Sequence, residues 1–280
     1  MEQSLQGRIC DCAEAMEGIP VIALDRVRAL ASELGVSPRE VELAALEARV
    51  LPRRYLCSFG TVGWEGQIRL LRSTAAVVGL GGLGGTVLEG LARMGVGRLI
   101  VIDGDVFVDH NLNRQILCSE EDVGLLKAEV ARARVAQINA AVEIIAHSEE
   151  VTEDNLSRLL GEAEVVVDAL DRLPTRLMLQ EAAQAMGIPM VHGAIAGYLG
   201  QAMTIFPGDQ GLQALYSGGS VPQQGVEVQL GCPAATPMMV AAWQVQEVIK
   251  ILLGQGQLLR HRMLLMDAEA GNVDILEIGN

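Results

Sequence analysis

Apolar segments of strand length alternate with amphipathic segments of helix length from residue 75 onward. A strand, a helix and a further strand in succession build a parallel sheet through right-handed crossovers, with helices on both faces. The expected strands are AAVVGL, RLIVID, VEIIAH, VVVDAL and PMVHG, and helices are expected near 82–94, 123–139, 153–160 and 174–187. The pattern therefore predicts an α/β fold with a Rossmann-like doubly wound sheet.

The pattern changes after Gly197. GQAMTIFP is expected to add a strand, residues 208–230 to form a long loop, and residues 234–253 to form a helix. RMLLMDAEAGNVDILEI is expected to close as an antiparallel hairpin with its turn at EAGN. We therefore expect the parallel strands to be continued by antiparallel C-terminal strands.

The first 50 residues differ in character from the rest and are expected to be helical. Ser37, Pro38 and Glu40 match the N-cap, the first helical position and the capping-box glutamate of one helix. Two helices joined through GVSP also occur in DNA-reading helix-turn-helix units, but the second helix has few basic residues. A helical arm that packs on the main body or on a second subunit is favoured. We expect a helical N-terminal extension over residues 1–52 and a nucleotide-binding domain over residues 53–280.

Charge and composition exclude several classes of function. The formal net charge is −14 over 280 residues, which argues against binding to a nucleic-acid backbone. No uncharged apolar segment reaches the ~20 residues that a bilayer span requires, and the N-terminus lacks the pattern of a secretory signal. The five cysteines are odd in number and scattered, which favours reduced thiols in the cytoplasm.

A glycine-rich loop and two aspartates predict nucleotide binding. Glycines after a first strand permit a tight turn and let backbone N–H groups approach phosphates at a helix N-terminus. A carboxylate at the end of the second strand accepts hydrogen bonds from ribose hydroxyls. The candidate residues are Gly79, Gly81, Gly82 and Gly84 in the loop, and Asp103 and Asp105 after the second strand. On these residues alone the nucleotide could be NAD or ATP.

The residues that follow favour ATP. Asn111, Asn113 and Arg114 lie on the loop after the second strand, and Lys127 lies at the start of the next helix. Cations beside a phosphate-binding turn can clamp a triphosphate and neutralise the charge that develops on a leaving phosphate. A dehydrogenase has no task for these cations. Taken singly, each could be an ordinary solvated charge.

A carboxylate on a further strand favours a metal ion. Asp168 lies within the run VVVDALD, and Asp171 lies just past its carboxyl end, where ligands bind in open sheets. Mg²⁺ binds through one or two carboxylates together with phosphate oxygens. Asp171 is therefore the candidate Mg²⁺ ligand.

The segments that carry these residues resemble the ThiF/MoeB/HesA family of ubiquitin-activating-enzyme-like adenylyltransferases, from about residue 53 to the end. The matching segments are RRYLCSFGTVGWEGQIRLLRSTAAVVGLGGLGG, VIDGDVFVDHNLNRQ, DVGLLKAE, VVVDALD and AAWQVQEVIKILLG. NLNRQ after Asp-x-Asp is the most specific of them.

The resemblance implies binding of ATP and Mg²⁺, commonly by a homodimer. It implies adenylation of the C-terminal Gly-Gly carboxylate of a small ubiquitin-like sulfur carrier, with release of pyrophosphate, in a molybdopterin or thiamine type of pathway. The roles carried over by motif position place Gly82 at the phosphate turn, Asp103 on the ribose, Asn111 and Arg114 on the phosphates, Lys127 on the transition state and Asp171 on Mg²⁺.

The chain departs from that family at several positions. It has no CxxC pair, so no zinc site is expected. Cys57 stands where the family's RYxRQ motif has an arginine that reaches the partner subunit's site, and Arg53 or Arg54 is a candidate substitute. Arg172 stands where an asparagine usually follows the Mg²⁺ aspartate, and we expect it to point at phosphate.

Two thiols and one histidine lie near the motifs of the expected site. Cys232 and Cys118 are expected to be small fillers rather than nucleophiles, and His110 is a candidate for the nucleotide pocket. The other histidines are expected to be structural.

Two alternative functions remain open on the sequence. One is a catalytically degenerate relative that binds nucleotide or carrier only, and the other is an NAD-dependent dehydrogenase. Within the same fold, the adenylated group could also be a small molecule, a peptide end or a tRNA base.

Overall fold

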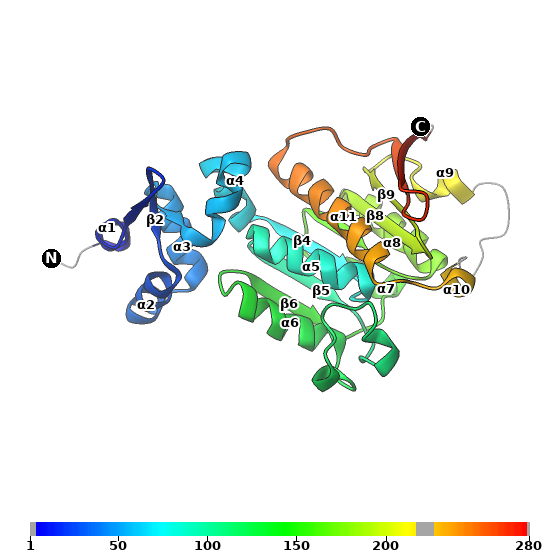
Figure 1. Cartoon of the computed structure of the whole chain (residues 1–280), viewed down its shortest axis with the longest axis horizontal. Helices are drawn as coiled ribbons and strands as arrows, with labels where there is room; N and C mark the ends of the chain where they lie inside the picture. Colours follow the sequence, from blue (N-terminus) through cyan, green and yellow to red (C-terminus); the bar gives the residue numbers. More distant parts are fainter. Residues whose placement is uncertain (1–3, 217–226, 279–280) are drawn as a thin grey trace.

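The apolar runs form the parallel half of a large mixed sheet, as the pattern predicts (Figure 1). The structure is a computed structural model that describes residues 4–216 and 227–278. Within these residues one sheet has the strand order β11-β10-β9-β8-β7-β4-β5-β6. The parallel strands are β4 (Thr74–Val78), β5 (Arg98–Ile102), β6 (Glu143–His147), β7 (Val165–Asp168) and β8 (Met190–Ala196).

Antiparallel strands extend this sheet beyond β8, which confirms the predicted arrangement. β9 (Leu199–Ile205) pairs with β8, and the hairpin of β10 (Arg262–Asp267) and β11 (Asn272–Glu277) continues the edge. β8 is thus parallel to one neighbour and antiparallel to the other.

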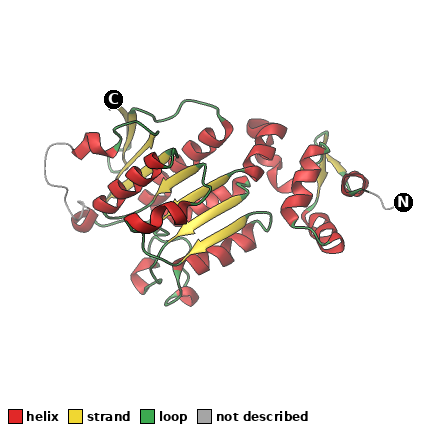
Figure 2. Cartoon of the chain, turned by 180° about the vertical axis from the view of Figure 1, so that it is seen from behind, coloured by secondary structure: helices red, strands yellow, loops and turns green. Residues whose placement is uncertain are grey.

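Helices cover both faces of the sheet because alternate strand side chains point to opposite sides. Val77 of β4 packs in the apolar cluster of α5 (Gly82–Met94), α6 (Lys127–Ile138) and α11 (Ala235–Leu253). Val78, the next residue, packs on the other face with α7 (Glu153–Leu160) and α8 (Leu173–Ala185). Figures 1 and 2 show these two helix layers from opposite sides. The helix α6 begins four residues later than expected, at Lys127.

The N-terminal unit lies at one end of the molecule and is not purely helical, which corrects the expectation for residues 1–52 (Figure 1). Its helices are α1 (Leu5–Asp11), α2 (Leu24–Leu34) and α3 (Pro38–Glu47), and the capping box at Ser37 is confirmed. Between and after them, β1 (Glu14–Met16), β2 (Ile19–Ile22) and β3 (Leu51–Pro52) form a small sheet. The boundary that we propose between residues 52 and 53 lies where β3 ends and the 3₁₀ helix η1 (Arg53–Ser58) begins.

A buried polar cluster joins this unit to the main body. Glu42 of α3 is fully buried, and its Oε1 lies 3.0 Å from Nε of Arg54. The Tyr55 hydroxyl donates to Glu42 Oε2 at 2.8 Å and accepts from Nδ2 of Asn139, which follows α6, at 3.1 Å. We call Glu42, Arg54, Tyr55 and Asn139 the joint cluster. Burial raises the pKa of Glu42, against the opposing effect of the Arg54 charge.

The expected long loop over residues 208–230 is wrong in part where the structure describes it. Two short helices, α9 (Leu212–Tyr216) and α10 (Glu227–Leu230), occupy parts of it. The backbone N–H of Leu212 donates to the side chain of Gln180 on α8, which fixes the start of α9. Residues 208–211 form turns and irregular backbone, as expected, and residues 217–226 lie outside the described residues. None of the described helices combines the length and apolar character that a bilayer crossing requires.

Candidate functional site

A cavity of about 290 Å³ lies at the carboxyl ends of the parallel strands. The chain proceeds from β4 to β5 and β6 on one side and returns to β7 on the other side of β4. Such a reversal of strand order opens a crevice between the loop that follows β4 and the loop that follows β7. Ligands bind in this crevice in open α/β sheets. The loops after β4, β5, β6 and β7 all contribute lining residues.

The glycine turn forms one wall of this cavity. Gly79 has φ +91°, and a Cβ there would lie 2.6 Å from the carbonyl oxygen of Ala169, so only glycine fits. Gly84 packs under the turn, where a Cβ would overlap the Gly79 carbonyl oxygen. Gly81 and Gly82 line the cavity at the start of α5, whose free N–H groups and dipole favour an anion. Of the predicted loop glycines, Gly84 therefore lies outside the cavity lining, and its task is helix–strand packing.

Asp103 links the end of β5 to this turn. Its Oδ2 accepts from Leu80 N at 2.7 Å, and its Oδ1 accepts from Asp105 N at 2.9 Å. The Lys127 ammonium lies 2.9 Å from Asp105 Oδ2 and 4.0 Å from Asp103 Oδ2. Burial raises the pKa of Asp103, and the Lys127 charge opposes that shift. We call Asp103, Asp105 and Lys127 the cavity cluster; its members are held in place and all line the cavity.

The loop that carries NLNRQ brings Arg114 to the cavity, but neither Asn111 nor Asn113 lines it. Asn111 is buried, and its Oδ1 accepts from Val108 N at 3.1 Å, so its observed contact shapes the loop. Arg114 donates to the His110 carbonyl at 3.1 Å and to Asn113 Oδ1 at 2.9 Å. His110 and Asn113 are exposed and do not line the cavity, contrary to the expectations for both residues.

Gln115 belongs to the site although it was not predicted. It is 6% exposed and lines the cavity, and its Oε1 has no hydrogen-bond partner among the described residues. A buried amide oxygen without a donor is costly, and this one is available to a ligand group or water in the cavity. The sequence signal was present, since Gln115 is the last residue of the same motif.

The loop after β7 supplies the opposite wall. Asp171 and Arg172 are exposed and line the cavity, as predicted from their place beyond the strand end. Arg176 lines it too, and its guanidinium donates to the Leu170 carbonyl. The spacing of Arg172 and Arg176 by one helical turn was a signal that the sequence interpretation missed. Together with Arg114 and Lys127, these side chains place cations on several sides of the cavity.

The cysteines, and the two arginines that could replace the family arginine missing at Cys57, lie in different environments. Cys232 lines the cavity, whereas burial and the nearby Asp122 raise the pKa of the Cys118 thiol and disfavour its thiolate. Cys57 is exposed. Arg54 pairs with Glu42 in the joint cluster, and Arg53 is exposed. In the described part of the chain, no three His, Cys, Asp or Glu side chains gather closely enough to hold a metal ion.

Known proteins similar to this chain include curated enzymes and solved structures. The SAMP-activating enzyme E1 of Haloferax volcanii is 40% identical over 211 residues, which cover 74% of this chain and 77% of that protein. The sulfur carrier protein adenylyltransferase of Thermus thermophilus is 38% identical over 217 residues, covering 74% and 79%. The E. coli MccB structure with MccA-N7isoASN has a similar fold, with a TM-score of 0.71, 21% identity, and coverage of 81% of this chain and 72% of that one. The model of the ThiF family matches residues 53–280, and the chain therefore belongs to the ThiF family.

Proposed function

We propose that this protein catalyses the ATP-dependent adenylation of the C-terminal Gly-Gly carboxylate of a small ubiquitin-like sulfur carrier, of molybdopterin or thiamine type, with release of pyrophosphate. The observation that carries the proposal is the meeting of Arg114, Lys127 and Asp171 around one glycine turn. The names of the two relatives, a SAMP-activating enzyme and a sulfur carrier protein adenylyltransferase, support it.

The cavity offers a binding group for each part of ATP. The turn at Gly81 and Gly82 would face the phosphates through backbone N–H groups. Each Asp103 oxygen accepts one hydrogen bond from the backbone and retains a second lone pair for a ribose hydroxyl. Arg114, Lys127 and Arg172 would contact the phosphates. Asn111 would support this set by holding the loop of Arg114, rather than by contacting a phosphate directly.

The reaction needs little covalent help from the protein. A carboxylate of the carrier attacks the α-phosphorus, a C–O–P bond forms, and the bond to the pyrophosphate oxygen breaks. No general base is needed, because a C-terminal carboxylate is already ionised at neutral pH. Positioning and stabilisation of the charge on the leaving pyrophosphate then account for catalysis. Arg114 and Lys127 would supply that stabilisation. To do so, the Lys127 ammonium would leave the carboxylate of Asp105, which is largely exposed, and pair with a phosphate oxygen instead.

The residues at the cavity fit Mg²⁺. Asp171 offers an exposed carboxylate beside the expected phosphate site, and Mg²⁺ takes one or two carboxylates with phosphate oxygens rather than an all-protein cage. Asp171 would hold the ion, which when bound offsets the charge of the phosphates. Arg172 would point at phosphate rather than at the ion.

The alternatives lose support from the family. Family membership and the named relatives point to carrier adenylation, and neither a dehydrogenase nor a degenerate binder is favoured. We further propose that the protein acts as a homodimer in the cytoplasm. Because Arg54 is committed to the joint cluster, Arg53 is the candidate to reach the partner subunit's site.

The test is ATP–pyrophosphate exchange with Mg²⁺ and a panel of carriers that end in Gly-Gly. Exchange that depends on one carrier is expected, and it would name the pathway. Arg114→Ala should abolish it, because the leaving pyrophosphate loses its guanidinium. Arg132→Ala is the matched control, since Arg132 lies on the surface of α6 and pairs with Glu129 away from the cavity. A folded Arg114→Ala protein with normal exchange would refute the proposal.

A further inference from the structure

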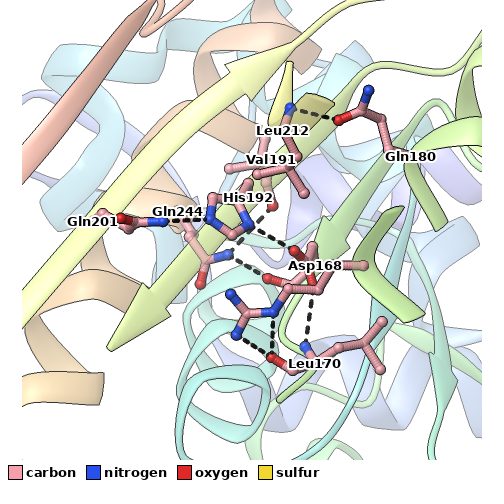
Figure 3. Close-up of polar contacts among 9 residues, drawn as sticks. Asp168, Leu170, Gln180, Val191, His192, Gln201, Leu212 and Gln244 are labelled. Atoms are coloured by element: carbon pink, nitrogen blue, oxygen red, sulfur yellow. Dashed lines mark hydrogen bonds and ion pairs between the residues drawn. The ribbon is translucent and has the colours of Figure 1, made fainter. Parts of the chain in front are cut away.

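Asp168 and His192 form a buried pair behind the cavity wall (Figure 3). The two residues lie directly opposite each other in the parallel pairing of β7 with β8. Their side chains are 0% and 1% exposed, and His192 Nδ1 lies 2.7 Å from Asp168 Oδ2. Neither residue lines the cavity, so neither is placed to touch a ligand there.

The hydrogen bonds around His192 define its protonation. The amide nitrogen of Gln201 can only donate, so His192 Nε2 is unprotonated and the neutral ring carries its proton on Nδ1, which donates it to Asp168 Oδ2. Nε2 is then free to accept from Nε2 of Gln201, 3.0 Å away on β9 (Figure 3). Burial lowers the pKa of His192, against the raising effect of Asp168, which agrees with a neutral ring. In small molecules and exposed histidines a proton on Nε2 is the common neutral form, so this arrangement is distinctive.

Asp168 in turn holds the loop that follows β7. Its second oxygen, Oδ1, accepts from Leu170 N at 3.1 Å, and its main-chain oxygen accepts from Gln244 Nε2 of α11 at 2.9 Å. Arg176 binds the Leu170 carbonyl from the other side. The next residue, Asp171, lines the cavity. The direction in which Asp171 leaves the strand is therefore set by bonds that converge on Asp168 and Leu170.

We propose that His192 is a positioning residue, which acts through Asp168 to hold residues 169–172 and to aim Asp171 at the nucleotide-bound metal. This inference rests on the proposed function, in which Asp171 binds the Mg²⁺ ion of MgATP. Without a donor at Nδ1, the buried carboxylate loses one of its hydrogen bonds. It can recover that bond only by turning toward the solvent of the cavity, which releases Leu170 N and lets the loop move.

The first test is the affinity for MgATP, measured by calorimetry on the full chain. His192→Leu removes the donor at similar bulk, and we expect MgATP binding to weaken roughly 10-fold or more, as for other groups that orient a metal ligand. Binding of ATP in the presence of EDTA should change much less. His192→Asn, whose amide can donate from the position of Nδ1, should restore most of the MgATP affinity.

The matched control is Gln180→Leu. Gln180 is also fully buried. Its side chain accepts from Leu212 N and donates to the Gln210 carbonyl, so both partners lie outside residues 168–172 (Figure 3). It should lose stability without a selective loss of MgATP affinity. An equal loss in Gln180→Leu would overturn the inference.

The second test needs no variant to fold and no nucleotide. In nitrogen NMR of the histidine-labelled protein, His192 should show a proton on Nδ1 and an unprotonated Nε2. A proton on Nε2 would overturn the assignment of Asp168 as its acceptor. Failure of the wild-type protein to bind MgATP overturns the proposed function, whereas normal wild-type binding with an unchanged His192→Leu affinity overturns only this inference.

Discussion

The joint cluster and the cavity cluster each place a buried carboxylate beside a cation, but they differ in what completes the bonding. Glu42 Oε2 accepts from the Tyr55 hydroxyl, and Oε1 has the Arg54 charge 3.0 Å away but no hydrogen bond among the described residues; both partners come from the same chain. Asp103 receives two backbone N–H groups and has Lys127 nearby, yet it faces a cavity. A closed cluster stabilises the fold, whereas an open one keeps bonding capacity for a ligand. Substitutions should therefore affect stability in the first and chemistry in the second.

Glu42→Ala should have the largest effect on stability. Removing one member of a buried ion pair leaves the other charge without a partner, which costs about 3–5 kcal/mol. Urea unfolding measures the loss, and the MgATP affinity of the folded protein should stay unchanged. The control is Glu47→Ala on the same helix, where the exposed pair with Arg72 should contribute about 0–1 kcal/mol. Equal losses in the two variants would contradict the distinction.

Lys127→Ala should affect catalysis more than stability, in contrast to Glu42→Ala. Loss of a cation that stabilises the leaving pyrophosphate should lower the rate of ATP–pyrophosphate exchange by about 10²–10³-fold. Its effect on unfolding should be smaller than that of Glu42→Ala, since Asp105 is exposed and Asp103 keeps its two backbone donors. A stability loss as large as that of Glu42→Ala, with exchange retained, would place Lys127 among the structural residues instead.

Tyr55→Phe tests the contribution of a single hydroxyl to the joint cluster. The variant keeps the ring but removes a hydroxyl that both donates to Glu42 and accepts from Asn139, at a cost of about 1–3 kcal/mol. Combination with Glu42→Gln in a double-mutant cycle should reveal coupling between the two side chains. Additive losses in urea unfolding would mean that the cluster does not act as a unit.

The smallest expected effect is a pH dependence of stability. Because burial raises the pKa of Glu42, the folded protein holds a proton at pH values where the unfolded chain has released it. The contribution of Glu42 to the free energy of unfolding is therefore fully present below the ordinary glutamate pKa and declines as the pH rises through the folded value. Glu42→Gln should flatten this decline. An unchanged slope in unfolding experiments between acidic and neutral pH would show that another group causes it.

The sequence was sufficient where local chemistry decides the structure. The turn at Gly79 admits no side chain, and the capping box at Ser37 is complete within four residues. The order of strands and helices in the main body follows from periodicity, and so does the meeting of Asp103, Lys127 and Asp171 at one edge of the sheet.

Sequence interpretation failed where distant residues decide the structure. β1 and β2 have three and four residues, too few for a period to show, and β2 contains Pro20. His192 looked like one dispersed histidine, because its partner Asp168 lies on another strand and only their register brings them together. Arg54 could not be assigned to the joint cluster until α3 was seen to pack against it.

The register between β7 and β8 also bears on which alignment of the sheet is stable. β7 and β8 are joined by a helix, so their alignment is not set by a tight turn, and a slip of one residue would turn over every side chain of β8. His192 would then enter the apolar layer that now holds Val191, and Asp168 would be buried without its donor. Apolar side chains alone tolerate such slips far better than a buried hydrogen-bonded pair does. The pair therefore favours the observed alignment of β7 and β8 over a slipped one, with or without a bound nucleotide.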